Sequence, residues 1–330
     1  MSHIIYNSTH SVDIIIDIIN SSIYNTVLSL LLLIMNDSPK KQLSASYKQL
    51  INNYTLDSSN KESLCFRCVI LGYYNDLYVL DDKWVRINIF TFLEDIDTKA
   101  FRFAWTGLLN SHSSYNKIPN HLHRYYIYAI DRLNELTKET QEMFVQSLTL
   151  LIAFSKANQK KIMNKIFYNE LKSLKTIFLE EITTTLMEID KEERIHFWKY
   201  WLLPLINDIN NNVYNLNTEE LLIILKWIPF SECYFDKFIN KIIYFPSLTF
   251  NDINMHLITD IINMKVRGHD KAMAKFLIFV LQDINKDSNY IFFHIEEIFK
   301  NINFESIPNL KDQIENLFLK YGIDFKEYAH

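Results

Sequence analysis

Glycine is the residue that this sequence lacks most clearly. It has 4 glycines among 330 residues, against an average share of roughly 7%. Phosphate-binding loops, nucleophile elbows and tight hairpin turns need glycine for a positive φ or for close approach of the backbone. Gly72, Gly107, Gly268 and Gly322 are too few and too scattered to build them. The composition instead favours long helices joined by turns rich in asparagine, aspartate and serine.

Cysteine, apolar runs and positive charge are limited as well. Three cysteines, an odd number in so long a chain, indicate a reducing compartment rather than a disulfide framework. The most apolar stretch near the N-terminus, residues 27–35, is shorter than the roughly 18 residues of a membrane span, and no signal-peptide pattern precedes it. The formal charge of −5 gives no general attraction for nucleic acid or anionic lipid. We therefore expect a cytoplasmic protein without membrane attachment.

What the sequence does contain is helical periodicity, and it is clearest over residues 101–109. The apolar side chains fall at i, i+3, i+4, i+7 and i+8, which is one buried face of an α-helix: Phe101, Ala104, Trp105, Leu108 and Leu109. Trp105 is the bulky anchor of this face, whereas Ala104 and Gly107 are small enough to let a neighbouring helix come close. After a polar loop, residues 122–136 form a second amphipathic helix. The two predict an αα-hairpin.

The remaining segments predict more helices, about a dozen in all. Asp190 followed by Glu193, and Asn217 followed by Glu220, are helix start signals, and prolines end or kink helices at 204, 229 and 246. Residues 160–189 predict one long helix, or one broken once near 183–185. Residues 252–267 and 290–302 predict two further helices. Residues 73–83 are the least helical and predict a loop or a short strand.

These patterns predict an all-α fold, an irregular stack of helical hairpins of the α-solenoid or HEAT-like superhelix kind. A helical segment over 1–84 is expected to continue into a helical-hairpin array over 85–330, with a soft boundary near 73–83. No strict repeat period emerges. Residues 12–35 are apolar almost all round, which indicates a helix buried in the body or against another chain.

One cysteine pair has the spacing of a metal or redox motif. Cys65 and Cys68 form a CxxC, which can hold zinc or exchange disulfides. Zinc needs a second pair of ligands, but Cys233 is remote, and the motif lies in an apolar helical stretch without the βαβ context of a redox fold. We interpret the pair as buried structural cysteines.

The histidines offer equally little for catalysis. His121 and His123 stand at i and i+2, whose side chains point apart on a helix, so a polar, exposed helix start is the simpler interpretation. His269 lies between Gly268 and Asp270, where a glycine C-cap and an aspartate N-cap explain the same residues. The Glu-x-x-His pairs of helical metalloenzymes are not reproduced, because Glu193–His196 stands alone and His294 precedes Glu297. The sequence therefore assigns no catalytic, cofactor-binding or metal-binding residue.

Two surfaces can be proposed from residue type alone. On an uninterrupted helix, the following basic and aromatic residues lie within about 40° of a common direction: Lys161, Lys165, Tyr168, Lys172 and Lys175. Such a stripe can bind phosphates and stack on a base, although a solvated helix face explains it as well. Separately, the helix around Tyr200 and Trp201 is apolar on more than one side, and this excess can form an oligomer or partner surface.

Several of these segments, taken in order, resemble a known family. They are KAFRFAWTGLL at 99–109, the helix over 122–136, FWKYWLLP at 197–204 and EELLIILKWIP at 219–229. The pattern looks like a helical domain of unknown function that follows a sirtuin-like NAD-consuming domain in bacterial antiphage-defence proteins. The resemblance covers roughly residues 85–325 and carries no catalytic motif.

The resemblance implies a sensing, scaffolding or assembly role in antiphage immunity. The sirtuin-like part needs a glycine-rich nucleotide fold of roughly two hundred residues, which residues 1–84 do not supply, so this chain is not expected to consume NAD. We therefore expect a non-enzymatic subunit without cofactors that acts with an effector domain on a partner chain. The alternatives are a nucleic-acid-binding protein that uses the Lys161–Lys175 stripe, and a hydrolase or nucleotide-processing enzyme whose site is assembled from distant helices.

Overall fold

The fold is all-α. The computed structural model describes residues 22–37, 42–57, 59–111, 120–154, 159–168, 172–245, 268–282, 302–322 and 324, and within these ranges the regular structure is helical, with no strand. This confirms the predicted fold class. Among the described helices, none is both long and apolar enough to cross a membrane. The helices expected over 252–267 and 290–302 lie outside the described residues.

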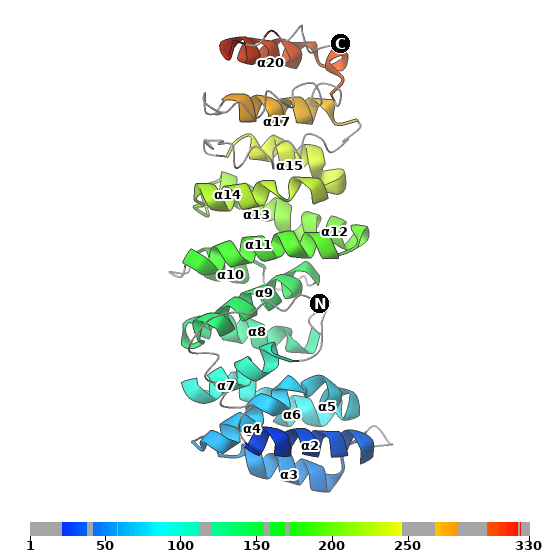
Figure 1. Cartoon of the computed structure of the whole chain (residues 1–330), viewed down its shortest axis with the longest axis vertical. Helices are drawn as coiled ribbons and strands as arrows, with labels where there is room; N and C mark the ends of the chain where they lie inside the picture. Colours follow the sequence, from blue (N-terminus) through cyan, green and yellow to red (C-terminus); the bar gives the residue numbers. More distant parts are fainter. Residues whose placement is uncertain are drawn as a thin grey trace. The chain divides into compact units, whose positions relative to one another are not determined.

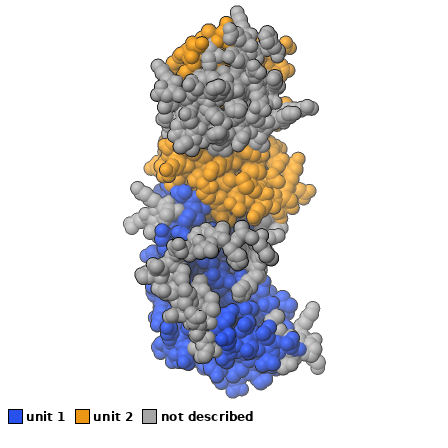
Figure 2. Space-filling view, in the orientation of Figure 1, with its two compact units in different colours: residues 1–151, 160–177 blue, residues 152–159, 178–330 orange. Residues whose placement is uncertain are grey.

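The chain divides into two compact units, coloured separately in Figure 2. Unit 1 comprises residues 1–151 and 160–177, and unit 2 comprises residues 152–159 and 178–330. The division therefore does not fall at the boundary expected near residues 73–83. Helices on both sides of residue 84 pack together inside unit 1, because α4 (Lys61–Gly72) lies against α7 (Thr98–Leu109).

Unit 1 is a set of short helices around α4, which packs against α2, α3 and α7. The other elements that lie wholly in unit 1 are α2 (Ser22–Asp37), α3 (Ala45–Thr55), α5 (Tyr74–Leu80), α6 (Asp82–Asn88), η1 (Phe90–Glu94), η2 (Asn120–Leu122), α8 (His123–Ala129) and η3 (Ile130–Glu135). Helix α10 (Gln159–Phe167) lies in unit 1 except for its first residue. Two longer helices, α9 (Lys138–Phe154) and α11 (Lys172–Glu188), contribute residues to both units.

The crossing of α4 and α7 confirms the role predicted for the small residues near Trp105. A Cβ atom placed on Gly107 would lie 2.1 Å from the carbonyl oxygen of Cys68, so only glycine allows this approach of the two backbones. Trp105 is fully buried beside it, and its indole N–H donates to the Leu93 carbonyl at 3.2 Å. Its ring packs edge-on against Tyr126 and Phe144. The predicted anchor is therefore the centre of the unit 1 core.

The structure corrects the prediction for residues 73–83. Instead of a loop or strand, these residues form α5 and the beginning of α6. The two helices are separated by Asp81, which has non-helical backbone angles and caps α6 by accepting the Trp84 N–H at 3.1 Å. A single capping residue thus lets the chain turn between two helices of seven residues each without the glycine or proline that usually signals a turn.

A second correction concerns the long helix predicted over 160–189. Helix α10 ends at Phe167, Tyr168 follows as a bend, and α11 starts at Lys172. The break expected near 183–185 does not occur there: α11 continues to Glu188, and the hydroxyl groups of Thr183 and Thr184 bond back to the carbonyls four residues earlier. Such back-bonding satisfies threonine inside a helix.

Helix α2 covers the described part of the apolar segment 12–35. Val27, Leu31 and Ile34 are buried, whereas Leu32 and Leu33 are each more than half exposed. The helix therefore has one side in the core of unit 1, where it packs on α4, and an apolar side that remains outside it. Residues 12–21 lie outside the described part of the chain.

Unit 2 contains a row of helices that pack in chain order. Helix α13 (Leu203–Asn210) contacts α15 (Phe235–Ile242), α15 contacts α17 (Asp270–Gln282), and α17 contacts α20 (Pro308–Lys320), as can be followed in Figure 1. The other described elements are α12 (Lys191–Phe197), the π-helical turn η4 (Trp198–Leu202), α14 (Thr218–Leu225), η5 (Ile228–Phe230), η6 (Glu232–Tyr234) and η7 (Phe304–Ser306).

The start signals read from the sequence are confirmed in unit 2. Asp190 caps α12 by accepting the Glu193 N–H at 2.9 Å. Asn217 and Glu220 form a reciprocal capping box on α14. Pro204 does not end a helix; it is the second residue of α13, and α13 follows the π-helical turn η4 directly. A proline lacks the N–H that would continue the i→i−4 ladder, and π-turns are one way to accommodate such an interruption.

Candidate interaction surfaces

The basic stripe predicted over 161–175 does not form one helical face. Lys161 and Lys165 belong to α10, whereas Lys172 and Lys175 belong to α11, and Tyr168 lies in the bend after α10. The prediction that all five side chains point in a common direction assumed one uninterrupted helix. Because α10 and α11 are separate helices, that assumption is wrong for the five residues together. Lys161, Lys165 and Tyr168 are nevertheless all exposed, with Tyr168 at 62%.

Lys161 and Lys165 meet at one carboxylate. The Nζ atoms lie 2.7 Å and 3.0 Å from the two Asp131 oxygens. These lysines, Lys161 first, hold the pKa of the Asp131 carboxyl below its usual value through their hydrogen bonds and charges. Two ammonium groups on one carboxylate leave a net positive charge on this part of α10, and the exposed Tyr168 follows three residues after Lys165. Of the predicted basic surface, Lys161, Lys165 and Tyr168 therefore remain.

Trp201 does not lie on a surface. Its side chain is 1% exposed, which corrects the prediction that it contributes to a partner surface. The helix there is buried on several sides because Phe197, Trp198 and Leu202 also lie in the core of unit 2. The apolar residues of this segment therefore pack in the core of unit 2 and do not form an exposed surface.

Tyr200 is partly exposed in unit 2. It is half-buried, its ring centroid lies 4.5 Å from that of His196, and the ammonium of Lys199 lies 5.0 Å from its centroid. About one helical turn at the junction of α12 and η4 thus carries an imidazole, an ammonium group and an aromatic ring close together. This His196–Lys199–Tyr200 cluster is what remains of the predicted partner surface.

The CxxC cysteines have the buried environment that we inferred. Cys65 and Cys68 are 2% and 6% exposed in α4, and burial raises the pKa of the Cys68 thiol. A thiol whose pKa is raised by burial is a poor nucleophile at neutral pH. Across the described ranges, no group of three or more His, Cys, Asp or Glu side chains is placed to hold a metal ion.

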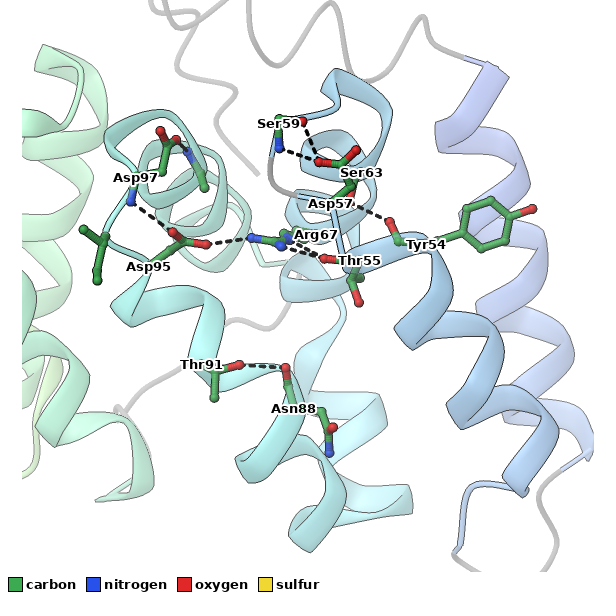
Figure 3. A network of polar contacts seen from close by, with 12 residues as sticks. Tyr54, Thr55, Asp57, Ser59, Ser63, Arg67, Asn88, Thr91, Asp95 and Asp97 are labelled. Atoms are coloured by element: carbon green, nitrogen blue, oxygen red, sulfur yellow. Dashed lines mark hydrogen bonds and ion pairs between the residues drawn. The ribbon is translucent and has the colours of Figure 1, made fainter.

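Between the two cysteines, Arg67 forms a buried polar network that sequence reasoning missed. Its guanidinium donates to the Thr55 carbonyl at 2.9 Å and 2.6 Å and to Asp95 at 2.8 Å, and it lies 4.6 Å from the Phe92 ring centroid. Figure 3 shows these contacts joining the C-terminal end of α3, α4 and the turn before α7. The signal in the sequence was an arginine inside the apolar run LCFRCVIL, since a buried charge requires partners. The role of this network is structural.

His121 is less exposed than predicted. Its ring packs against two aromatic side chains, with centroids 3.9 Å from Tyr78 and 5.4 Å from Phe90. Burial, with the nearby positive charge of Arg86, lowers the pKa of His121 to about 4. Its Nε2 atom is buried and has no hydrogen-bond partner among the described residues. The interpretation as an exposed helix start is therefore wrong for this residue.

His269 does not pair with the adjacent Asp270. Its Nδ1 atom lies 2.7 Å from an Asp236 oxygen in the preceding helix of the row, 33 residues away. Asp270 instead accepts the N–H of Asn303 at 2.9 Å. Both contacts join successive segments of unit 2, and neither places a nucleophile beside the imidazole.

Comparison with models of protein families, with curated proteins and with solved structures finds no match.

Proposed function

We propose that this chain is a non-enzymatic interaction subunit of a bacterial antiphage-defence system. In this proposal it works in the cytoplasm as a scaffold or sensor, and the effector domain belongs to a partner chain. The defence context rests on the resemblance of residues 99–109, 122–136, 197–204 and 219–229 to the helical domain described above. The interaction role rests on the structure of the buried polar groups.

The observation that supports an interaction role is where the buried polar side chains form their bonds. Arg67 binds a backbone carbonyl, Glu220 caps a helix, and Ser231 donates to the Ile228 carbonyl. The indole N–H groups of Trp198 and Trp227 donate to Phe230 O at 2.7 Å and Thr183 Oγ1 at 3.0 Å. Each bond holds one element to another or satisfies a helix end. An active site uses buried polar groups differently, since it makes several of them converge on one position.

Helical hairpins suit this role for a physical reason. Each pair of helices buries one face against its neighbours and leaves another in solvent, so a row of helices offers a long surface with no need for catalytic geometry. We also propose that the helical hairpins of the whole chain stack into a superhelix. Within unit 2, the row α13, α15, α17 and α20 is the element that would present such a surface.

The test is affinity capture of the full-length chain from cells that carry its native gene neighbourhood, followed by mass determination of the captured species. We expect a stoichiometric partner with a nucleotide-binding or nuclease domain. Tyr200→Glu places a negative charge in the His196–Lys199–Tyr200 cluster and should reduce capture at least tenfold. Met187→Glu is the matched control in the same unit, because Met187 is 60% exposed. Recovery of the chain alone would overturn the proposal.

Nucleic-acid binding through α10 is the second candidate, and the Asp131 site is the observation that favours it. The surplus positive charge of Lys161 and Lys165 beside the exposed Tyr168 can contact a phosphate and stack a base. The double variant Lys161→Glu/Lys165→Glu should then abolish binding of RNA or DNA at low salt. Unchanged affinity in this variant would exclude the α10 site.

A further inference from the structure

A pattern of seven residues occurs twice in the helical row of unit 2. Residues 236–242 read DKFINKI and residues 270–276 read DKAMAKF, so aspartate, two lysines and three apolar positions recur after 34 residues. The first copy occupies α15 and the second begins α17, and these two helices pack together. The repeat places four lysines on two adjacent helices: Lys237, Lys241, Lys271 and Lys275.

The packing contacts hold the two copies in the same register. Lys241 donates to the side-chain oxygen of Asn207 in α13, and Lys275 donates to that of Asn240 in α15 at 2.7 Å. Each of these lysines thus reaches back to an asparagine on the preceding helix, 34 and 35 residues earlier. The two contacts are of the same type and differ by one residue in spacing. Because the lysines recur at i and i+4 on two helices that pack together, we call the four of them the α15–α17 lysine grid.

These lysines keep their charge because their partners are neutral. An amide oxygen accepts one N–H bond from an ammonium group that has three to give, and it cancels none of the charge. Among the described residues, none of the four lysines forms an ion pair. By contrast, Lys161 and Lys165 share the carboxylate of Asp131. The α15–α17 grid therefore has the larger unpaired positive charge of the two surfaces.

The negative total charge of the chain does not prevent local attraction. At physiological ionic strength the Debye length is about 8 Å, so carboxylates further away are largely screened. The nearest acidic groups on the two helices are Asp236 and Asp270, each at a helix start and each already engaged, with His269 and with the Asn303 N–H. Within the described residues of α15 and α17, an anion over the four lysines thus meets more positive than negative side chains.

The spacing and one aromatic side chain indicate the kind of anion. Lysines at i and i+4 are about 6 Å apart along a helix, and adjacent helices lie about 8–10 Å apart, so the grid suits several linked anionic groups rather than one. Tyr244 lies three residues after Lys241 and seven after Lys237, its N–H bonds to the Lys241 carbonyl at 3.1 Å, and its side chain is 75% exposed. An aromatic ring beside lysines can stack on an unpaired base.

We propose that the four-lysine grid of α15 and α17, together with Tyr244, binds single-stranded nucleic acid. The lysines contact successive phosphates and Tyr244 stacks on a base. A duplex offers phosphates but keeps its bases stacked inside, so it lacks the group that Tyr244 would recognise. This activity is separate from the interaction role proposed above and does not depend on it.

The test uses the full-length chain and fluorescently labelled oligothymidylate and oligouridylate. Four phosphate contacts predict a slope of about −3 for the logarithm of affinity against the logarithm of salt, or roughly 50-fold weaker binding at 200 mM than at 50 mM salt. Lys237→Gln/Lys271→Gln removes two contacts and should halve the slope. Tyr244→Ala should weaken binding about tenfold and leave the slope unchanged.

Matched controls assign the effect to this surface. Lys83→Gln/Lys99→Gln removes two exposed lysines from α6 and α7 in unit 1 and should change neither affinity nor slope. The α10 candidate described above predicts that Lys161→Glu/Lys165→Glu abolishes binding, whereas a site on α15 and α17 predicts that binding stays intact, so this variant decides between the two sites. Absence of binding, or an equal loss in either control, would overturn the proposal. Equal binding of a blunt duplex, or equal competition by polyglutamate, would overturn the assignment to single strands. Far-UV circular dichroism checks that each variant is folded.

Discussion

Replacement of Gly107 by alanine tests the closest contact in unit 1. The added methyl carbon would lie 2.1 Å from the Cys68 carbonyl oxygen and 2.8 Å from two further backbone atoms of the same residue. Because all three are backbone atoms of α4, no side-chain rotation can relieve the clash. Ordinary contacts begin near 3.4 Å, so α4 and α7 must separate by about 1.3 Å.

The cost of that separation can be worked out from the surrounding core. A gap of about 1 Å already removes a quarter to a half of the dispersion energy between facing atoms, and the affected face includes the buried Phe101 and Trp105. Overpacking of a dense core typically costs 1–3 kcal/mol, whereas alanine gains about 1 kcal/mol over glycine in helix propensity. We expect Gly107→Ala to be destabilised by about 2 kcal/mol, since the collision is with backbone and lies at the upper end of that range.

The measurement is urea unfolding followed by far-UV circular dichroism, with hydrogen exchange of the α4 and α7 amides as a local readout. Gly72→Ala is the matched control, because a Cβ there would meet only the Gly107 carbonyl oxygen at 3.7 Å, an ordinary contact. This control should be neutral or slightly stabilised. If Gly107→Ala unfolds at the same urea concentration as the parent and the control, the close approach of α4 and α7 is refuted.

Two further predictions concern buried ionisable groups of unit 1. Arg67→Met leaves the Thr55 carbonyl and the Asp95 carboxylate without their shared partner. Because one member of a buried pair is lost, the free energy of unfolding, measured with urea at pH 7, should fall by about 3 kcal/mol. A decrease of less than half this value would contradict the network. For His121, the folded pKa of about 4 lies below the unfolded value near 6.5, so the unfolded state binds the proton first and stability should fall as the pH drops from 6.5 to 4. His121→Phe should flatten this dependence, and an unchanged slope in the variant would exclude His121 as its source.

The elements that sequence reasoning predicted correctly are those fixed by local chemistry. The periodicity of residues 101–109 identified α7 and its buried face, and the small size of Gly107 predicted the close helix crossing. Asp190 and Asn217 predicted helix starts, since a cap is a contact over three residues that any packing preserves. The glycine scarcity predicted helices, and the described residues contain no strand.

The predictions that failed were those that depended on packing between helices. The π-helical turn before Pro204 and the burial of Trp201 follow from the way unit 2 surrounds this segment, and the periodicity of a single helix contains no such information. The helix break after Phe167 had no proline or glycine to announce it. Likewise, the partner of Lys161 and Lys165 is Asp131, some 30 residues earlier, and no local pattern connects them.

The recurrence of residues 236–242 at 270–276 was missed for a related reason. A search for repeats by apolar identity finds little here, because Phe238 and Ile239 are replaced by Ala272 and Met273 and the helix faces differ in volume. What recurs is the polar frame, and it recurs because each helix of the row must bond to the one before it. In this row of helices the repeat is therefore easier to recognise from the lysine–asparagine contacts than from the identity of the core residues. Asn207→Ala and Asn240→Ala would each remove the hydrogen-bond partner of one lysine without changing the charge of the grid. If charge governs the affinity for nucleic acid, salt-dependent binding should persist in both variants. If the fixed position of the lysines governs it, both variants should bind more weakly.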